Sequence, residues 1–188
     1  MARENDTPDA AGLRHPAPAA APAPAEAAEA AQAAQPPETP ATLAVAAAGL
    51  EHELRSHGRV GSLEEAAAAL GVEPREIVKT LVVRRNEGEH LLVLVPGDRR
   101  FSWPKLRALL GENRLTMPDA AGAKAVTGYE RGTITPFGTT TPLPLILDAS
   151  LVGRRVSLGA GRHGLALIVN ADDVAAHLNG TFADVSED

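Results

Sequence analysis

Apolar residues recur along this chain in short runs, and glycine, proline and charged residues separate one run from the next. Apolar runs that are continuous, or that alternate every second residue, are typical of β-strands. The pattern predicts strands at residues 50–57, 80–85, 90–96, 144–148, 154–159 and 165–169. The segment Asn-Glu-Gly-Glu at 86–89 has the composition of a hairpin turn and would join the second strand to the third.

Helical segments lie between these strands and carry recognisable ends. Ser62 begins one of them, Glu65 stands three residues later in the arrangement of a capping box, and Gly71 ends it. Pro104 and Gly111 mark the start and the end of another. The predicted helices cover residues 62–70, 74–79, 103–110, 119–127 and 171–178.

Strands outnumber helices in this pattern, and several neighbouring strands are close enough in sequence to pair as hairpins. These features favour an α+β fold with a mixed, largely antiparallel sheet or open barrel flanked by short helices. We expect a single compact domain over residues 41–188.

The first forty residues differ in composition, with 15 alanines, 8 prolines and only Met1 and Leu13 as large apolar residues. Such a segment cannot bury enough apolar surface to offset the entropy of ordering, so a disordered tail is expected at residues 1–40. The segment lacks the basic start and apolar centre of a signal peptide. No other segment approaches the length of a membrane helix, so we expect a cytoplasmic protein without membrane contact.

The formal net charge of −6 is unevenly distributed along the chain. Residues 41–171 hold 16 Lys and Arg against 13 Asp and Glu, whereas both ends of the chain are acidic. The middle of the chain could therefore present a basic face to a polyanion such as nucleic acid. An excess of this size is more often a solvated surface.

Several kinds of catalytic site find no support in the sequence. The chain has no cysteine, which excludes a thiol nucleophile and disulfide bonds. No serine lies in a Gly-x-Ser-x-Gly elbow, and the six histidines are too scattered for a metal site. No Walker or Gly-x-Gly-x-x-Gly motif is present. We therefore expect neither a metal nor a cofactor.

Two charged residues adjoin predicted strands. Lys79 precedes the apolar strand at 80–85, where an ammonium group is costly to bury without a partner. It is either a surface lysine at the end of a helical turn or a lysine at a pocket mouth that holds a phosphate or carbonyl oxygen. Asp148 ends the strand at 144–148 and is either a turn residue or an acid that orders a pocket loop.

A long loop rich in glycine, threonine and proline precedes that last strand. In this loop Gly128, Gly132 and Gly138 permit positive φ angles, and Pro136 stiffens the turn. Such a loop can direct several backbone N–H groups at one oxygen and stabilise negative charge without a catalytic side chain.

Five segments together carry a resemblance to a known family: VKTLVV, TGYERGTITPFG, LILDAS, GAGRHGLALIVNADDVAAHL and FADV. In their order and spacing they resemble the bacterial YbaK-type aminoacyl-tRNA deacylases, which are related to the editing insertion of bacterial prolyl-tRNA synthetases. The resemblance covers nearly all of residues 43–185. It implies a trans-editing hydrolase that deacylates mischarged aminoacyl-tRNA, typically proline tRNA carrying cysteine, alanine or another small amino acid.

The resemblance also implies the site residues. Lys79 would anchor the terminal adenosine or its phosphate, and the Gly132 region would position the ester carbonyl and an attacking water, helped by the substrate's 2′-hydroxyl. Tyr129 and Phe137 would fix the loop to the core. The residues implied in substrate binding are Thr80, Tyr129, Thr133, Pro136, Phe137, Gly138, Asp148, Gly159 and Gly161. The implied partners are tRNA and an aminoacyl-tRNA synthetase.

Several positions depart from the family pattern. Thr133 and Thr135 replace a glycine and a serine of close relatives, and Gly159 replaces a serine at the start of the glycine-rich turn. Ser62 stands where some cysteine-specific members have an aromatic residue. Loss of an aromatic and of a hydroxyl predicts a wider pocket, and Thr133 predicts a narrower entrance. The amino acid specificity therefore stays open.

Two other classes of function are compatible with the same residues. A non-catalytic module could capture aminoacyl-tRNA or a nucleotide with the same basic face, and a turnover assay separates it from an enzyme. An interaction protein could act through the Ala/Pro-rich tail, and deletion of residues 1–40 tests that alternative.

Overall fold

The computed structural model describes residues 37–188, so the tail expected at residues 1–40 lies almost entirely outside the described residues. The helices are α2 (Pro40–Ala47), α3 (Leu63–Leu70), η1 (Pro74–Glu76), α4 (Trp103–Leu110), α5 (Ala120–Thr127), η2 (Ala149–Leu151) and α6 (Ala171–Leu178). The strands are β1 (His52–Ser56), β2 (Val78–Asn86), β3 (Glu89–Pro96), β4 (Arg100–Phe101), β5 (Leu145–Asp148), β6 (Arg155–Gly159), β7 (Leu165–Asn170), β8 (Thr181–Ala183) and β9 (Ser186–Glu187).

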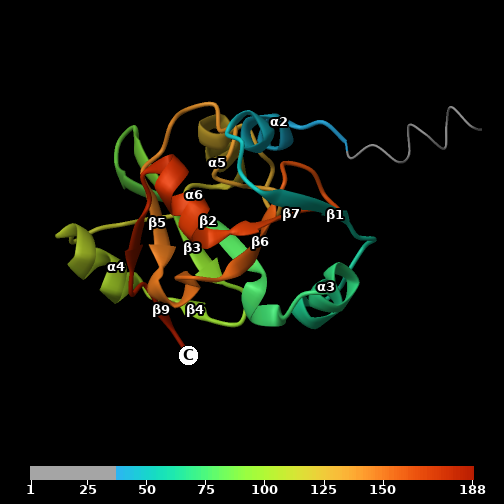
Figure 1. The fold of residues 1–188 in the computed structure, drawn as a ribbon. Coiled ribbons are helices and arrows are strands. Elements are labelled where there is room, and N and C mark those ends of the chain that lie inside the picture. Colours follow the sequence, from blue (N-terminus) through green and yellow to red (C-terminus); the bar gives the residue numbers. More distant parts are fainter. Residues whose placement is uncertain (1–36) are drawn as a thin grey trace, which may run out of the picture. The chain divides into compact units, whose positions relative to one another are not determined.

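The described strands form three sheets (Figure 1). One sheet is antiparallel and has the strand order β1, β7, β6. The second sheet is mixed and has the order β2, β3, β5, β8. In the second sheet β2 and β3 are an antiparallel hairpin, whereas β5 is parallel to both of its neighbours. β4 and β9 form a short antiparallel pair. The α+β fold with mixed, largely antiparallel strands is confirmed, and these strands do not close into a barrel.

Alternation along β3 divides the core in two. Leu92 and Leu94 belong to the larger core, which the four-stranded sheet shares with β6, β7, α2 and α6. Val93 and Val95 belong to a smaller core on the other face, which includes residues of α4 and of the C-terminal segment. Each of the four side chains is at most 2% exposed. Both faces of β3 are therefore covered, which explains its continuous apolar sequence.

The ends of α3 follow the sequence signals closely. The Ser62 hydroxyl accepts a hydrogen bond from the Glu65 amide at 3.1 Å, and Gly71 ends the helix with a φ of 64°. The Glu65 carboxylate accepts from the amide of Gly61, at 2.7 Å, and not from that of Ser62. The carboxylate thus reaches one residue further back than the N-cap amide that it would bind in a regular capping box.

The sequence pattern does not predict α2. Thr39 is its N-cap and Pro40 its first residue, although the sequence interpretation assigns both to the tail. The Thr39 hydroxyl donates to the carbonyl oxygen of Ala160 at 2.7 Å, and Ala41 and Val45 are fully buried. The same hydroxyl caps the helix by accepting a hydrogen bond from the Thr42 amide at 3.1 Å.

The helix expected at residues 74–79 is wrong beyond Glu76. Ile77 has an extended backbone, with a ψ of 124°, and forms a parallel bridge with Ser157 of β6. β2 therefore begins at Val78, two residues earlier than expected, and Lys79 lies on a strand. None of the helices within residues 37–188 is long and apolar enough to cross a membrane.

Candidate functional site

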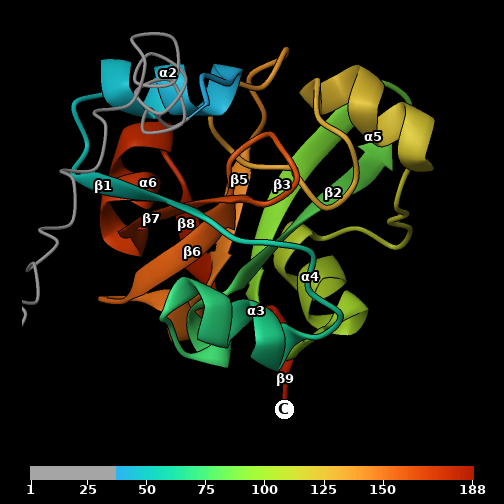
Figure 2. The same ribbon diagram turned by 90° about the vertical axis from the view of Figure 1, so that its right-hand side faces the viewer.

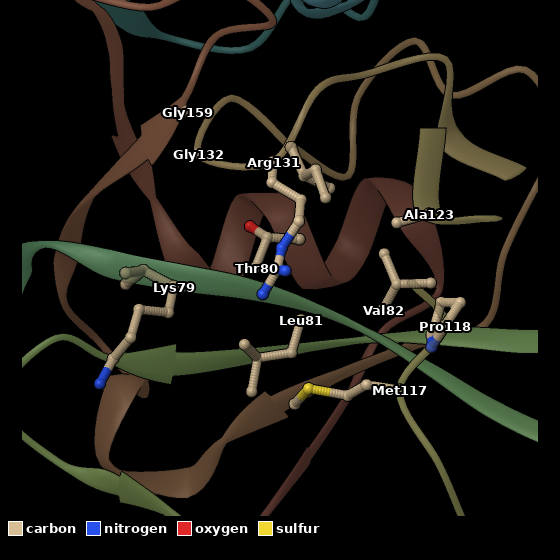
Figure 3. A pocket seen from close by; sticks show the side chains of 12 residues that line it. Lys79, Thr80, Leu81, Val82, Met117, Pro118, Ala123, Arg131, Gly132 and Gly159 are labelled. Carbon is tan, nitrogen blue, oxygen red and sulfur yellow. The ribbon is translucent and has the colours of Figure 1, made fainter. Parts of the chain in front are cut away.

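A cavity of about 320 Å³ opens between β2 and the loop at residues 128–138, and we call it the β2 cavity (Figure 3). β2 forms one wall and the loop faces it, while residues 117–118, α5 and the end of β6 complete the lining. The lining residues are Val78, Lys79, Thr80, Leu81, Val82, Met117, Pro118, Ala123, Arg131, Gly132, Ile134 and Gly159.

Two cationic residues and no carboxylate are among these lining residues. Figure 3 shows Arg131 reaching from the loop toward Thr80 and Leu81, whereas the Lys79 side chain extends away from Arg131. Both cationic side chains are exposed, and the Lys79 ammonium donates to the carbonyl oxygen of Arg99 at 2.9 Å. Lys79 therefore lies at the rim of a pocket and not at the end of a helix. A cavity with this charge favours an anionic or strongly polar ligand.

Two polar groups of lining residues lack partners within residues 37–188. The Oγ1 atom of Thr80 is shielded from solvent and has no hydrogen-bond partner in the described part of the chain. On the loop, Gly132 has a φ of 87°, and its N–H donates to no other group of residues 37–188. A buried hydroxyl without a partner costs about 1–3 kcal/mol. The Gly132 N–H remains available to a ligand that carries an acceptor oxygen, whereas the Thr80 Oγ1 is closed to solvent and to such a ligand alike.

Tyr129 and Phe137 fix the loop to the core as expected. Both belong to the larger core, where they are 3% and 1% exposed. The Tyr129 hydroxyl donates to the carbonyl oxygens of Phe137, at 2.8 Å, and Gly138, at 3.1 Å. Burial raises the pKa of Tyr129 to about 12, so the phenol stays neutral and remains a donor. Neither aromatic residue lines the cavity, so both act from behind the loop.

Two glycines of the β6–β7 turn let the loop approach closely. A Cβ atom at Gly159 would lie 2.9 Å from the carbonyl oxygen of Ile134. A Cβ atom at Gly161 would lie 2.7 Å from the ring of Tyr129, and the Gly161 amide donates to the carbonyl oxygen of Thr133 at 3.1 Å. Any side chain at Gly159 would collide with the loop in this arrangement.

Thr133, Pro136 and Gly138 shape the loop without lining the cavity. The Thr133 side chain is 2% exposed, and its hydroxyl donates to the carbonyl oxygen of Glu130 at 2.9 Å. The expectation that Thr133 narrows the entrance is therefore wrong. Pro136 is buried, and Gly138 packs so closely on the backbone of Pro40 that no side chain would fit.

Asp148 lies outside the cavity lining and ties the C-terminal segment to the domain. It is 2% exposed and accepts hydrogen bonds from the Ser150 amide, at 3.0 Å, and the Val185 amide, at 3.2 Å. Burial opposes the charged form, but the hydrogen bonds that the carboxylate accepts, above all from the Ser150 hydroxyl, outweigh it and lower the pKa of Asp148. Of its two interpretations, the structure favours the turn residue.

Among the expected site residues, the structure places Lys79, Thr80, Gly132 and Gly159 in the lining. The sequence interpretation misses other lining residues, of which the most prominent are Arg131, Met117, Pro118 and Ile134. Arg131 and Ile134 lie within two residues of Gly132 in the sequence and could have been found from that proximity. Within residues 37–188, no group of three or more His, Cys, Asp and Glu side chains is arranged to hold a metal ion.

Known proteins are similar to this chain in sequence and in fold. The family model for the aminoacyl-tRNA editing domain matches residues 57–176. EbsC of Enterococcus faecalis, named as a candidate Cys-tRNA(Pro)/Cys-tRNA(Cys) deacylase, is 28% identical over 126 residues, which are 66% of this chain and 77% of EbsC. The proline–tRNA ligase of Syntrophotalea carbinolica is 43% identical over 93 residues, which are 49% of this chain and 16% of the ligase.

Solved structures extend the similarity to the fold. A crystal structure described as a candidate trans-editing enzyme for prolyl-tRNA synthetase has a TM-score of 0.73 and 27% sequence identity, and the match covers 81% of this chain and 100% of that one. The chain spans most of EbsC, but only 14–22% of the proline–tRNA ligases that it matches. The likeness to the ligases is thus confined to one part of those enzymes.

Proposed function

This chain belongs to the aminoacyl-tRNA editing domain family, and on that premise we propose that it acts in trans on mischarged aminoacyl-tRNA. In this proposal it hydrolyses the ester that joins the amino acid to the RNA. The observation that carries the proposal is the chemistry of the β2 cavity. Its lining combines two cations with Gly132, whose backbone N–H has no partner within residues 37–188. Among the lining residues, which all belong to the described part of the chain, there is no serine, cysteine, histidine or carboxylate.

With this lining, water is the nucleophile in our proposal. The Gly132 N–H holds the ester carbonyl oxygen and stabilises the negative charge that develops on it. Water adds to the carbonyl carbon, the bond from that carbon to the ribose oxygen breaks, and the ribose oxygen takes up a proton. The neighbouring ribose hydroxyl of the substrate orients the water, so the protein supplies positioning and charge stabilisation.

The remaining lining residues suit the other parts of the substrate. Lys79 and Arg131 at the rim attract the phosphate of the terminal nucleotide. Apolar side chains, among them Val78, Val82 and Ile134, receive the side chain of the amino acid. A volume of about 320 Å³ favours a small amino acid, and we propose proline tRNA carrying cysteine or alanine as the substrate. Prolyl-tRNA synthetase, which produces such errors, is the partner we propose, in the cytoplasm.

The test is release of labelled amino acid from a panel of mischarged tRNAs, measured with and without a chelator. We expect catalytic turnover of at least one small amino acid on proline tRNA, and the same rate after chelation. Tight binding of the charged tRNA without release would instead identify a binding module. A rate that falls in chelator and returns with zinc would contradict hydrolysis by these residues alone.

A further inference from the structure

A second depression lies beside the β2 cavity, and we call it the outer depression. It measures about 610 Å³ and lies between the segment that follows β1 and the turn between β6 and β7. Figure 2 shows both segments on the face of the domain where β1 crosses in front of the sheet. Its lining residues are His57, Gly58, Arg59, Val60, His163 and Gly164, with no carboxylate among them.

The outer depression adjoins the β2 cavity at Gly132. A Cβ atom at Gly132 would meet the ring of His163 at 3.4 Å, and His163 lines the outer depression. The amide of His57 donates to the carbonyl oxygen of Gly164 at 2.8 Å, which ties the two walls of the depression together. A ligand that fills the β2 cavity can therefore continue past Gly132 and His163 into the outer depression.

The charges around the outer depression favour an anion. Arg59 is exposed and forms no ion pair with any residue of 37–188. The carboxylate of Glu130 lies 3.8 Å from the His163 ring, and that of Glu65 accepts from the amide of Gly61, next to Val60, at 2.7 Å. Glu130 is already paired with Lys124 at 3.1 Å, so its charge is largely compensated. Arg59 is thus available for a ligand.

We propose that the outer depression holds the RNA strand that leads to the esterified nucleotide, with Arg59 paired to a backbone phosphate. His57 and His163 lie against the adjoining nucleotides. The inference rests on the proposed function, because it places the esterified end in the β2 cavity. Phosphate contacts supply most of the sequence-independent affinity for nucleic acid, and histidine rings stack on unpaired bases. The ligand is therefore the single-stranded 3′ end of a tRNA.

A second basic groove offers the other route for the strand. It lies at the β2–β3 hairpin and is lined by Arg84, Arg85, Asn86, Glu87, Arg114 and Thr116. Here Arg85 is paired with Glu112 at 2.7 Å, and Arg84 donates to the Thr116 hydroxyl at 3.2 Å. A carboxylate, Glu87, belongs to the lining as well. Two of its three arginines are engaged and a carboxylate lies among them, which favours the outer depression.

Charge reversal tests the route. Arg59→Glu and its matched control Arg114→Glu both change an exposed arginine that forms no ion pair within residues 37–188. Each variant is compared with the parent in binding of an uncharged RNA minihelix that ends in unpaired CCA. Each is also compared in hydrolysis of the same amino acid esterified to that minihelix or to adenosine alone. Melting curves check folding.

We expect Arg59→Glu to weaken minihelix binding and lower kcat/KM on the charged minihelix by about tenfold, with a salt dependence shallower by about 0.7 in log–log slope. Hydrolysis of aminoacyl-adenosine should stay at the parental rate, because that substrate does not reach the outer depression. Arg114→Glu should change neither minihelix binding nor the hydrolysis of either substrate. The inference would be overturned if Arg59→Glu lowered hydrolysis of both substrates equally or lowered neither. It would also be overturned if only Arg114→Glu lost activity on the minihelix. A parent that binds the minihelix but hydrolyses nothing would defeat the proposed function, while the binding data still decide the route.

Discussion

The substitution Gly132→Ala distinguishes two roles for Gly132. In one role the glycine only permits a tight turn, and in the other its backbone contacts the reacting ester. The φ of 87° at this position strains any residue with a side chain, while the new methyl group would meet the His163 ring at an ordinary contact distance of 3.4 Å. The expected cost is therefore backbone strain alone, about 1–2 kcal/mol. For a chain of 188 residues this lowers Tm by roughly 2–8 °C, so the variant stays folded.

The effect on catalysis is expected to be much larger than the effect on stability. Relief of the strain turns the peptide plane at Gly132, and the N–H moves away from the ester oxygen. Loss of one such donor slows acyl transfer by about 100- to 1,000-fold. We predict a reduction of this size in the single-turnover rate of amino acid release, measured on the sample that gives the melting curve.

Gly88→Ala is the matched control. Gly88 lies in the β2–β3 hairpin with a φ of 78°, and a Cβ atom there would have no neighbour within 4 Å. This substitution imposes a similar strain outside the β2 cavity, so it should lower Tm by a similar amount and leave the rate unchanged. A folded Gly132→Ala protein that keeps more than about a third of the parental rate would refute the role of its N–H.

Three further predictions concern residues around the cavity and the loop. Lys79→Ala should raise KM for charged tRNA by about fivefold at unchanged Tm, while Lys79→Arg retains affinity, as steady-state kinetics would show. Tyr129→Phe leaves two loop carbonyl oxygens without their donor and should cost about 1–2 kcal/mol in urea unfolding. Asp148→Asn should cost about 1–3 kcal/mol at neutral pH, because the NH2 group that replaces Oδ2 cannot accept from the Val185 N–H. Since the folded pKa of Asp148 is lowered, its carboxylate stabilises the fold above its ordinary pKa of 3.8 and loses that contribution as pH falls through the folded value. Unfolding of Asp148→Asn should lack this acid-dependent component, and an unchanged pH profile would contradict it.

Much of the fold follows from local patterns in the sequence. β2, β3, β6 and β7 are apolar on at least one face and are separated by glycine-containing turns, so their pattern survives without tertiary information. α2 is different, since its alanines give no amphipathic signal and its position depends on the Thr39 hydroxyl and the carbonyl oxygen of Ala160. The parallel partners of β5 cannot be predicted from the sequence either, because short spacing between strands indicates only antiparallel neighbours.

The site was predictable where chemistry and backbone conformation coincide. The sequence indicates three loop glycines that permit positive φ, Gly128, Gly132 and Gly138, and the family resemblance singles out Gly132 among them. Lys79 lies next to an apolar strand and is conspicuous for that reason. Arg131 resembles any surface arginine in the sequence, and only the packing of the loop against β2 brings it over the cavity. Asp148 marks the end of a strand, and the sequence contains no sign that its partner is Val185.

The central claim is that the aminoacyl ester is held in the β2 cavity, between β2 and the loop that contains Gly132. A crystal structure with alanyl-adenosine joined by a non-hydrolysable amide tests it most directly. The account predicts that the alanyl group lies among Val78, Val82 and Ile134, and that the Gly132 N–H donates to the carbonyl oxygen of the amide. An analogue bound at another surface, with the β2 cavity unchanged, would contradict it.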